Sequence, residues 1–268
     1  MASTVTPTAS VTLVAPAHGR AARLRSAASR VALHGLLIGL SVVALVPIVW
    51  MLSTSLKASG TEYEWPIRWI PERIVFGNYV KALTVMNFGA YYRNTFTIAI
   101  LATLGTTLTS AMAGFAFARL RFVGRGPLFI LVLSTMMLPE AVTLIPTYIV
   151  FRTVHWIDTL FPLIVPSWLG GGAFYIFLVR QFFLTIPHEL DEAARIDGAG
   201  DFRIFWQILL PLAGPVLAVT AVFTFVDKWT QFLTPLIYLN SDQNRTVALG
   251  IALDRVTQGT RRKEEGLA

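Results

Sequence analysis

Five long apolar runs alternate with short polar segments along this chain. The runs are Val31–Leu52, Thr95–Ala118, Leu128–Phe151, Leu160–Phe183 and Leu212–Leu239. A helix needs roughly 20 apolar residues to cross about 30 Å of hydrocarbon, and every run reaches that length. The pattern therefore predicts an all-α fold, a polytopic transmembrane helical bundle with five visible spans.

Prolines and glycines mark places where these spans should depart from straight helices. In the third run, Pro139 and Pro146 predict a kink, and backbone groups freed by the kink could line a cavity. Gly170–Gly172 interrupts the fourth run, although these glycines could equally serve tight helix packing. The fifth run is the longest and contains Pro235, so we expect its outer end to bend away from lipid.

Polar residues inside the apolar runs are candidates for a transport path, because an unpaired charge in lipid is costly. Glu140, Asp227 and Gln231 are the residues that we select for such a path, with Lys228 as a further candidate. Glu140 could instead lie near the outer interface. Asp227 and Lys228 are adjacent and would point in different directions on a helix, so we do not expect an ion pair between them.

Composition supports a membrane protein. Hydrophobic residues make up 54% of the chain and charged residues 14%, and the mean hydropathy is +0.62. This balance excludes an ordinary soluble globular domain. The net charge of +7 is scattered over the loops. Without an aromatic-interleaved basic groove, we do not expect nucleic-acid binding.

The placement of basic residues predicts the orientation of the chain in a membrane. Arginines lie before the first span, within a basic tail of residues 1–30 that we expect to be disordered, and in the link between the second and third spans. They are Arg20, Arg23, Arg25, Arg30, Arg119, Arg121 and Arg125. Cytoplasmic loops carry such an excess, so the N-terminus is expected in the cytoplasm. Counting spans then places residues 184–210 in the cytoplasm and Lys57–Arg93 outside.

The sequence offers no catalytic machinery. It lacks a Gly-x-x-x-x-Gly-Lys-Ser/Thr phosphate loop and a His-Glu-x-x-His zinc helix. It contains no cysteine, and its four histidines are far apart in the sequence. We therefore expect neither an enzyme nor a cofactor or metal site, and the energy for transport would have to come from a partner.

A polar island between the fourth and fifth runs is expected to begin with a short helix. Pro187 suits the first turn, and the acidic residues after it, among them Asp191 and Glu192, would lie near the positive end of the helix dipole. Asp191 and Arg195 have the four-residue spacing of a helical ion pair. Gly198 can adopt the left-handed conformation that ends a helix.

A second, amphipathic helix is expected after the turn, with Asp201 as its cap. Its apolar stripe consists of Phe202, Phe205, Trp206 and Leu209. In the first helix, Ala193 and Ala194 form a thin, smooth face that would let a partner surface approach closely. An ordinary amphipathic loop helix on the membrane surface would explain the charges and the stripe, but not the full spacing of the segment.

That spacing resembles the cytoplasmic coupling signature of permease subunits of bacterial ATP-binding-cassette importers. The resemblance rests on Glu192-Ala193-Ala194, on Gly198 four residues after Ala194, and on Ile208 and Pro211. It implies that the helix around Glu192–Gly198 docks in a cleft of a partner ATPase. The implied ATPase-coupling residues are Glu192, Ala193, Ala194, Asp197, Gly198, Ile208 and Pro211.

Further matches make the chain similar to the MalG-type permease subunits of carbohydrate importers, over roughly Leu36–Leu253. They are Asn78-Tyr79, Asn94-Thr95, Met137-Leu138-Pro139, Ile145-Pro146, and Trp229 with Phe232-Leu233. In that family, two different permease subunits sit on two ATPase subunits and receive carbohydrate from an extracytoplasmic solute-binding protein. Thr230 is a departure, since the family usually has Asn at this place.

These observations predict a non-enzymatic permease subunit, embedded in membrane lipid, with a transmembrane domain over residues 31–239. It would translocate a sugar or related polyol derivative by alternating access coupled to partner ATPases. An ion-driven secondary transporter working through Glu140 and Asp227 is the alternative.

The end of the chain differs from the family that it resembles. The family has a sixth span, which is missing here, and residues 240–268 are expected to form a polar C-terminal tail. We expect a truncated or frame-shifted product. The alternatives are a native five-span variant and a tail that folds along the external face.

Overall fold

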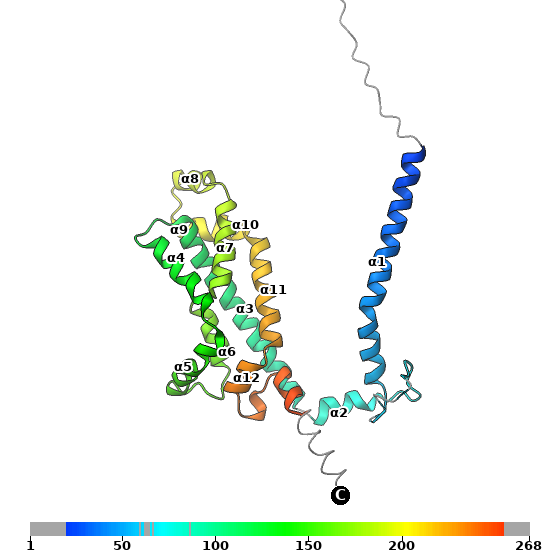
Figure 1. Cartoon of the computed structure of the whole chain (residues 1–268). Helices are drawn as coiled ribbons and strands as arrows, with labels where there is room; N and C mark the ends of the chain where they lie inside the picture. The colour runs from blue at the N-terminus through cyan, green and yellow to red at the C-terminus, as the bar shows by residue number, and fades with distance from the viewer. Residues whose placement is uncertain (1–19, 59, 62–64, 66, 86, 255–268) are drawn as a thin grey trace, which may run out of the picture. The chain divides into compact units, whose positions relative to one another are not determined.

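The computed structural model describes residues 20–58, 60, 61, 65, 67–85 and 87–254. All regular structure in these ranges is helical, as the sequence predicts (Figure 1). The α-helices are α1 (Arg20–Ser55), α2 (Gly77–Val85), α3 (Phe88–Arg119), α4 (Arg125–Ser134), α5 (Glu140–Thr153), α6 (Phe161–Ile164), α7 (Ala173–Thr185), α8 (Glu189–Ile196), α9 (Asp201–Arg203), α10 (Leu210–Leu212), α11 (Gly214–Thr230) and α12 (Leu233–Tyr238). The chain forms two compact units, which divide between Tyr79 and Val80.

In the first unit, the segment after α1 folds back onto the end of that helix. The Nδ2 of Asn78 donates hydrogen bonds to the carbonyls of Ser55, at 2.9 Å, and Lys57, at 2.7 Å. Lys57 is buried, and its ammonium lies 4.3 Å from the centre of the Trp50 ring. The first predicted span, Val31–Leu52, lies within α1 and exposes its apolar side chains, as a helix that faces lipid or another subunit would.

The helix α1 already begins at Arg20, so the last part of the tail predicted over residues 1–30 is helical rather than disordered. The rest of that tail lies outside the described residues.

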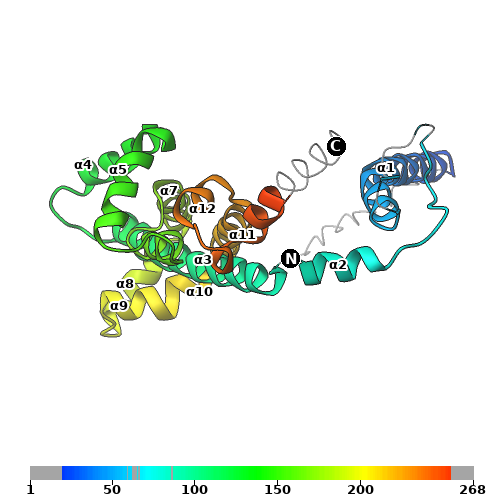
Figure 2. The same cartoon turned by 90° about the horizontal axis from the view of Figure 1, so that it is seen from below.

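In the second unit, α3 is the central helix and contains the predicted span Thr95–Ala118, while α7 and α11 pack along it (Figures 1 and 2). Glycines allow this close approach. A Cβ atom on Gly114 would lie 3.0 Å from the backbone nitrogen of Arg180 in α7, and one on Gly105 would lie 2.6 Å from the Trp168 ring. Larger residues at these two positions would push the neighbouring segments away from α3.

The third predicted span, Leu128–Phe151, is not one helix. It consists of α4 and α5, which are bent by 100° relative to each other. Leu138 is extended, as expected before a proline, and Pro139 precedes the first residue of α5. Pro146 lies inside α5 without interrupting it. The predicted kink is confirmed at Pro139, where the chain turns through 100°, so this run is a broken span or a re-entrant loop rather than one straight helix.

The fourth predicted span is interrupted at its three glycines, as predicted. α6 and a 3-10 turn at Val165–Trp168 precede Gly170–Gly172, and α7 follows. Gly171 has a φ of +70°, and a Cβ atom there would lie 2.9 Å from the backbone nitrogen of Ser110 in α3. Glycine is therefore needed both for the backbone conformation and for the approach to α3.

The fifth predicted span, Leu212–Leu239, is also broken. The helical segment Asp201–Leu212 meets α11 at an angle of 77°, and α11 ends at Thr230. Gln231 is extended, and the short helix α12 follows. The 77° bend lies at the start of this run, and the departure from a straight helix that was expected at its outer end begins at Gln231, ahead of Pro235.

The segment after α12 packs on the start of α3. The Nδ2 of Asn94 donates to the carbonyls of Gln243, at 2.7 Å, and Arg245, at 3.1 Å. Residues 247–254 are helical, and Leu249 is fully buried. The polar tail predicted from residue 240 is thus part of the packed unit as far as residue 254. Residues 255–268 lie outside the described chain.

The loop between α5 and α6 is fastened to the same segment. The carboxylate of Asp158 accepts hydrogen bonds from the backbone N–H groups of Asn240, at 2.9 Å, and Ser241, at 2.8 Å. The Nδ2 of Asn244 donates to the Asp158 carbonyl at 2.6 Å.

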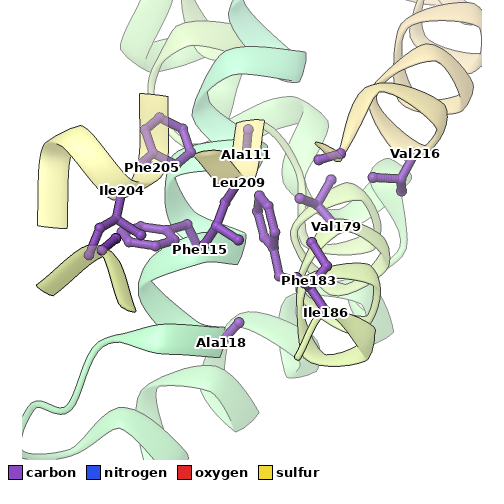
Figure 3. Close-up of a cluster of buried hydrophobic side chains, with 12 residues drawn as sticks. Ala111, Phe115, Ala118, Val179, Phe183, Ile186, Ile204, Phe205, Leu209 and Val216 are labelled. Atoms are coloured by element: carbon purple, nitrogen blue, oxygen red, sulfur yellow. The ribbon is translucent and has the colours of Figure 1, made fainter. Parts of the chain in front are cut away.

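A buried apolar cluster joins the ends of α3 and α7 to the segment that follows α8 (Figure 3). Its members are Ala111, Phe115, Ala118, Val179, Phe183, Ile186, Ala194, Ile204, Phe205, Leu209, Ala213 and Val216. The Phe115 ring lies 5.1 Å from that of Phe205 and 6.2 Å from that of Phe183, between centroids. Residues of the polar island are therefore anchored in the core of the unit.

Candidate functional site

The helix α8 has the start and end that its sequence predicts. It begins just after Pro187 and His188, and acidic residues occupy its first turn. Gly198 has a φ of +80°. The N–H of Ala199 donates to the Ala194 carbonyl at 2.9 Å, and that of Gly198 donates to the Arg195 carbonyl at 3.0 Å. These two bonds form a Schellman motif, so the left-handed end predicted at Gly198 is confirmed.

The ion pair predicted within α8, between Asp191 and Arg195, is wrong. The carboxylate of Asp191 lies 3.1 Å from the Nη1 of Arg119, at the end of α3, and 3.8 Å from the Nδ1 of His188. Only 1% of the Arg119 side chain and 9% of the Asp191 side chain are exposed. Asp191 therefore faces the bundle, and Arg195 pairs with Asp201 instead.

Arg119 connects three parts of the unit. Its Nη2 donates to the carbonyls of Phe183, at 2.7 Å, and Ile186, at 2.6 Å, beside the end of α7. Its Nη1 lies 2.6 Å from the Nδ1 of His188, just before α8. The last carbonyls of a helix lack partners within the helix. The guanidinium supplies a donor to the Ile186 carbonyl, just after α7, and a second donor to the Phe183 carbonyl, which also accepts from the Ile186 N–H at 3.3 Å. We call Arg119, Asp191 and the two carbonyls the Arg119 clamp.

The Arg119 clamp was missed by sequence reasoning, which used Arg119 only as a marker of orientation. An arginine carries a permanent charge, and its burial requires a counter-charge and hydrogen-bond acceptors. Asp191 and the two carbonyls supply both. The available signal was an arginine directly after a long run of apolar and small residues, with no polar neighbour on its amino-terminal side before Ser110.

The predicted coupling residues of α8 lie on two faces. Glu192, Ala193 and Asp197 are exposed, whereas Ala194 is only 8% exposed and packs in the core cluster. The smooth outer face predicted for both alanines is therefore wrong for Ala194. Its small side chain lets α8 lie close to its own bundle, and Ala193 alone remains available to a partner.

The other predicted coupling residues lie outside α8. Gly198 is exposed in the turn that ends the helix. Ile208 is half-buried and packs against the core cluster, and Pro211 lies in the first turn of α10. Both positions help to hold the chain after α8, and the structure does not bring them onto the exposed face of that helix.

The second helix of the polar island differs from the prediction. Gly200, rather than Asp201, precedes its first residue, and Asp201 accepts a hydrogen bond from Arg195 at 2.5 Å. The segment Ile204–Leu209 is a π-helix, in which the Leu210 N–H donates to the Phe205 carbonyl. The five-residue period places Ile204 and Leu209 on the same side, and both are buried.

The predicted stripe is therefore split between core and surface. Phe205 and Leu209 are buried, whereas Phe202 is 74% exposed and Trp206 is also exposed. Together with Ile196, which is 87% exposed, Phe202 gives the region around α8 an accessible apolar surface. We call Glu192, Ala193 and Ile196 the outer face of α8, since their three- and four-residue spacing puts them on one side of the helix.

The residues selected for a transport path do not all come together. Glu140 and Gln231 line one cavity. Gln231 donates to Thr234 at 2.9 Å, and Thr234 donates to Glu140 at 3.4 Å. Asp227 lies apart, with 60% of its side chain exposed, and its carboxylate is 3.5 Å from the Nζ of Lys228. This ion pair was not expected; the long lysine side chain reaches back to its neighbour.

Comparison with known proteins agrees with this architecture. Residues 105–257 match the family described as the binding-protein-dependent transport system inner membrane component. The alginate importer of a bacterium, an ABC transporter of known structure, contains a chain with the same fold. The TM-score is 0.71 at 24% identity, over 90% of this chain and 82% of that one.

Curated relatives include the diacetylchitobiose uptake system permease protein NgcG of Streptomyces coelicolor, which is 35% identical over 80% of this chain and 70% of its own length. The sn-glycerol-3-phosphate transport system permease protein UgpE of Rhizobium meliloti is 36% identical, over 81% of this chain and 78% of its own. The family match covers α8, the Arg119 clamp and the broken helices alike. The chain thus belongs to the binding-protein-dependent transport system inner membrane components, and is a multi-pass permease subunit of an ATP-binding-cassette importer.

Proposed function

We propose that this chain is one of two permease subunits of an importer for a sugar or related polyol derivative, and that α8 docks on a partner ATPase. A second permease subunit and an extracytoplasmic solute-binding protein would complete the assembly. The substrate class is supported by the names of the relatives, which are permeases for diacetylchitobiose and for sn-glycerol 3-phosphate.

The Arg119 clamp is the observation that carries the proposed mechanism. It ties the first turn of α8 to the ends of α3 and α7 through a buried ion pair and two carbonyl hydrogen bonds. Ala194, three residues after Asp191 in α8, packs in the core cluster. A displacement of α8 by a moving ATPase would therefore be passed to two spans at once, since these contacts leave α8 little freedom to move alone.

The contact between Arg119 and Asp191 also supports an orientation of the second unit in the membrane. Arg119, Arg121 and Arg125 occupy the link between α3 and α4, and Arg119 touches the start of α8. Short loops rich in arginine face the cytoplasm, where ATP is available. We infer that α8 and this link are cytoplasmic. A cytoplasmic N-terminus is supported only by the sequence, through the arginines that precede the first span.

Cysteine cross-linking tests the docking of α8, because the natural chain contains no cysteine. Ala193→Cys and Ala194→Cys form a matched pair, with adjacent residues on the exposed and buried sides of one helix. In membranes that contain the complete transporter, we expect Ala193→Cys to cross-link to a single cysteine placed in the docking cleft of the ATPase. Ala194→Cys should give a much lower yield. Equal yields from the two variants would contradict docking through the outer face of α8.

A further inference from the structure

A polar cavity lies where two broken helices of the second unit meet. It has a volume of about 240 Å³ and is lined by residues of α5, α6, α11 and α12. One break precedes Glu140, at the start of α5, and the other is at Gln231, between α11 and α12. Interrupted helices at membrane depth are tolerated where their free backbone groups face a cavity rather than lipid. Both breaks are therefore accounted for by the cavity between them.

The cavity offers hydrogen-bond donors and acceptors around a mixed pair of charges. Glu140, Thr143 and Thr147 line it from α5, and Lys228, Gln231 and Thr234 line it from the other side. Gln231, Thr234 and Glu140 already form a hydrogen-bonded chain. A hydroxyl or amide group can donate a hydrogen bond to a ligand hydroxyl or accept one from it. The Glu140 carboxylate can accept hydrogen bonds from two ligand hydroxyls.

The remaining wall is apolar. Phe151, Pro162, Pro166 and Ile237 contribute to the lining. A sugar ring has polar edges and C–H faces, so a cavity with a polar chain along one part and an apolar wall along another matches both.

We propose that this cavity is a contact site for an uncharged, polyhydroxylated ligand, within this subunit itself. The proposal rests on the function proposed above and narrows it from sugars or polyol derivatives to neutral ones. Ligand pockets for drug-sized molecules have volumes of about 300–1,000 Å³. At about 240 Å³, this cavity admits one ring of a saccharide at a time.

A phosphorylated ligand fits this site poorly. A phosphate group would face the carboxylate of Glu140, which repels it. Lys228 is the cation of the described lining, and its Nζ is 3.5 Å from the competing carboxylate of Asp227. The charges that line the cavity thus distinguish between diacetylchitobiose and sn-glycerol 3-phosphate, the two substrates in the relatives' names. It favours a neutral saccharide over glycerol phosphate.

The test uses the complete transporter, purified through a tag on this chain and reconstituted in proteoliposomes with internal ATP and saturating binding protein. The probes are neutral mono- and disaccharides, including diacetylchitobiose, and sn-glycerol 3-phosphate. Uptake and ATP hydrolysis are measured together. We expect the natural protein to import a neutral saccharide in an ATP-dependent manner. Substitutions in the cavity should reduce this import.

Glu140→Leu and Gln231→Leu should each lower the amount of saccharide imported per ATP by about tenfold, as expected for the loss of a hydrogen bond to the ligand. Glu140→Gln keeps an acceptor and should restore most of the uptake. Thr153→Val is the control, because Thr153 lies at the far end of α5 and bonds to the Val150 carbonyl of its own helix.

The outcomes separate the two proposals. Uptake of sn-glycerol 3-phosphate alone, or normal import by both leucine variants, would overturn the neutral-ligand site while leaving the importer function intact. Should Glu140→Leu fail to assemble, Gln231→Leu decides the question by itself. If the natural transporter imports no probe in an ATP-dependent manner, the proposed function fails first.

Discussion

The two ends of the second unit hold their charges in opposite ways. At the Arg119 clamp, an arginine with 1% exposure meets a carboxylate and two carbonyls at 2.6–3.1 Å. At the cavity, Glu140 is exposed and its contact to Thr234 is long, at 3.4 Å. A buried, closely paired network transmits displacement because it has few alternative arrangements. An exposed, loosely bonded network, such as the one at Glu140, can replace its internal hydrogen bonds with hydrogen bonds to a ligand.

The largest effect should come from Arg119→Met. Removing one member of a buried ion pair leaves the other charge without compensation and costs about 3–5 kcal/mol. The variant leaves the Asp191 carboxylate buried without its arginine and removes a donor from the Phe183 and Ile186 carbonyls, so α8 should loosen from the bundle. We expect a lower unfolding temperature in detergent and less uptake per ATP hydrolysed.

Arg121→Met is the matched control for that variant, because Arg121 is exposed in the same link. It should leave stability and coupling close to those of the natural protein. If both variants behave alike, the clamp has no special role and the contrast between the two ends disappears.

Gly198→Val tests the turn that ends α8. A β-branched residue at a φ of +80° is strained by about 1–3 kcal/mol. The strain should displace α8 and uncouple ATP hydrolysis from uptake, while the subunit still inserts in the membrane. Gly200→Val is the control, since Gly200 has a φ of −76° and open space around its Cβ position. Unchanged substrate uptake in Gly198→Val would refute this role of the turn.

Asp158→Asn tests how the cavity end is fastened. Burial acts to raise the pKa of Asp158, but hydrogen bonds from Ser241, Asn240 and Asn244 outweigh it and lower the pKa from 3.8 to about 2. A lowered pKa means that the carboxylate stabilises the fold above pH 3.8, and that this stabilisation is lost as the pH falls through about 2.

At neutral pH we therefore expect Asp158→Asn to lose about 1 kcal/mol of stability. The difference from the natural protein should shrink as the pH is lowered from about 4 to about 2, measured as unfolding temperature in detergent. A difference that stays constant over this range would argue against a role for the charge.

The smallest effect should come from Arg195→Ala. The pair between Arg195 and Asp201 spans the turn at Gly198, but the two side chains are 52% and 48% exposed. Exposed ion pairs contribute about 0.2–1 kcal/mol and are weakened by salt. Coupling should be nearly normal. A loss as large as that of Arg119→Met would mean that the surface pair, and not the buried one, holds α8.

Local rules were enough to predict the parts of the site that depend on neighbouring residues. The acidic first turn of α8 and the left-handed Gly198 follow from the preferences of a few consecutive residues. Pro139 and Gly170–Gly172 likewise indicate where helices break. Such residues do not determine the angle of the break, because that angle depends on what packs against the two halves.

Contacts between distant segments could not be predicted in this way. Asp191 has a suitable partner four residues away, yet it pairs with Arg119 because α3 ends beside the buried face of α8. The stripe that included Phe202 assumed an α-helical period, whereas the π-helix at Ile204–Leu209 changes the residues that share a face. In both cases the tertiary packing outweighs the local pattern.

Uptake into proteoliposomes with collapsed ion gradients tests the central claim most directly. The complete transporter would be reconstituted with ionophores, and uptake of the neutral saccharides compared with and without internal ATP. The ATP-driven mechanism predicts uptake that requires ATP and the ATPase subunits and is unaffected by the ionophores. Uptake by the permease subunits alone, following an imposed ion gradient and abolished by Glu140→Gln, would contradict it.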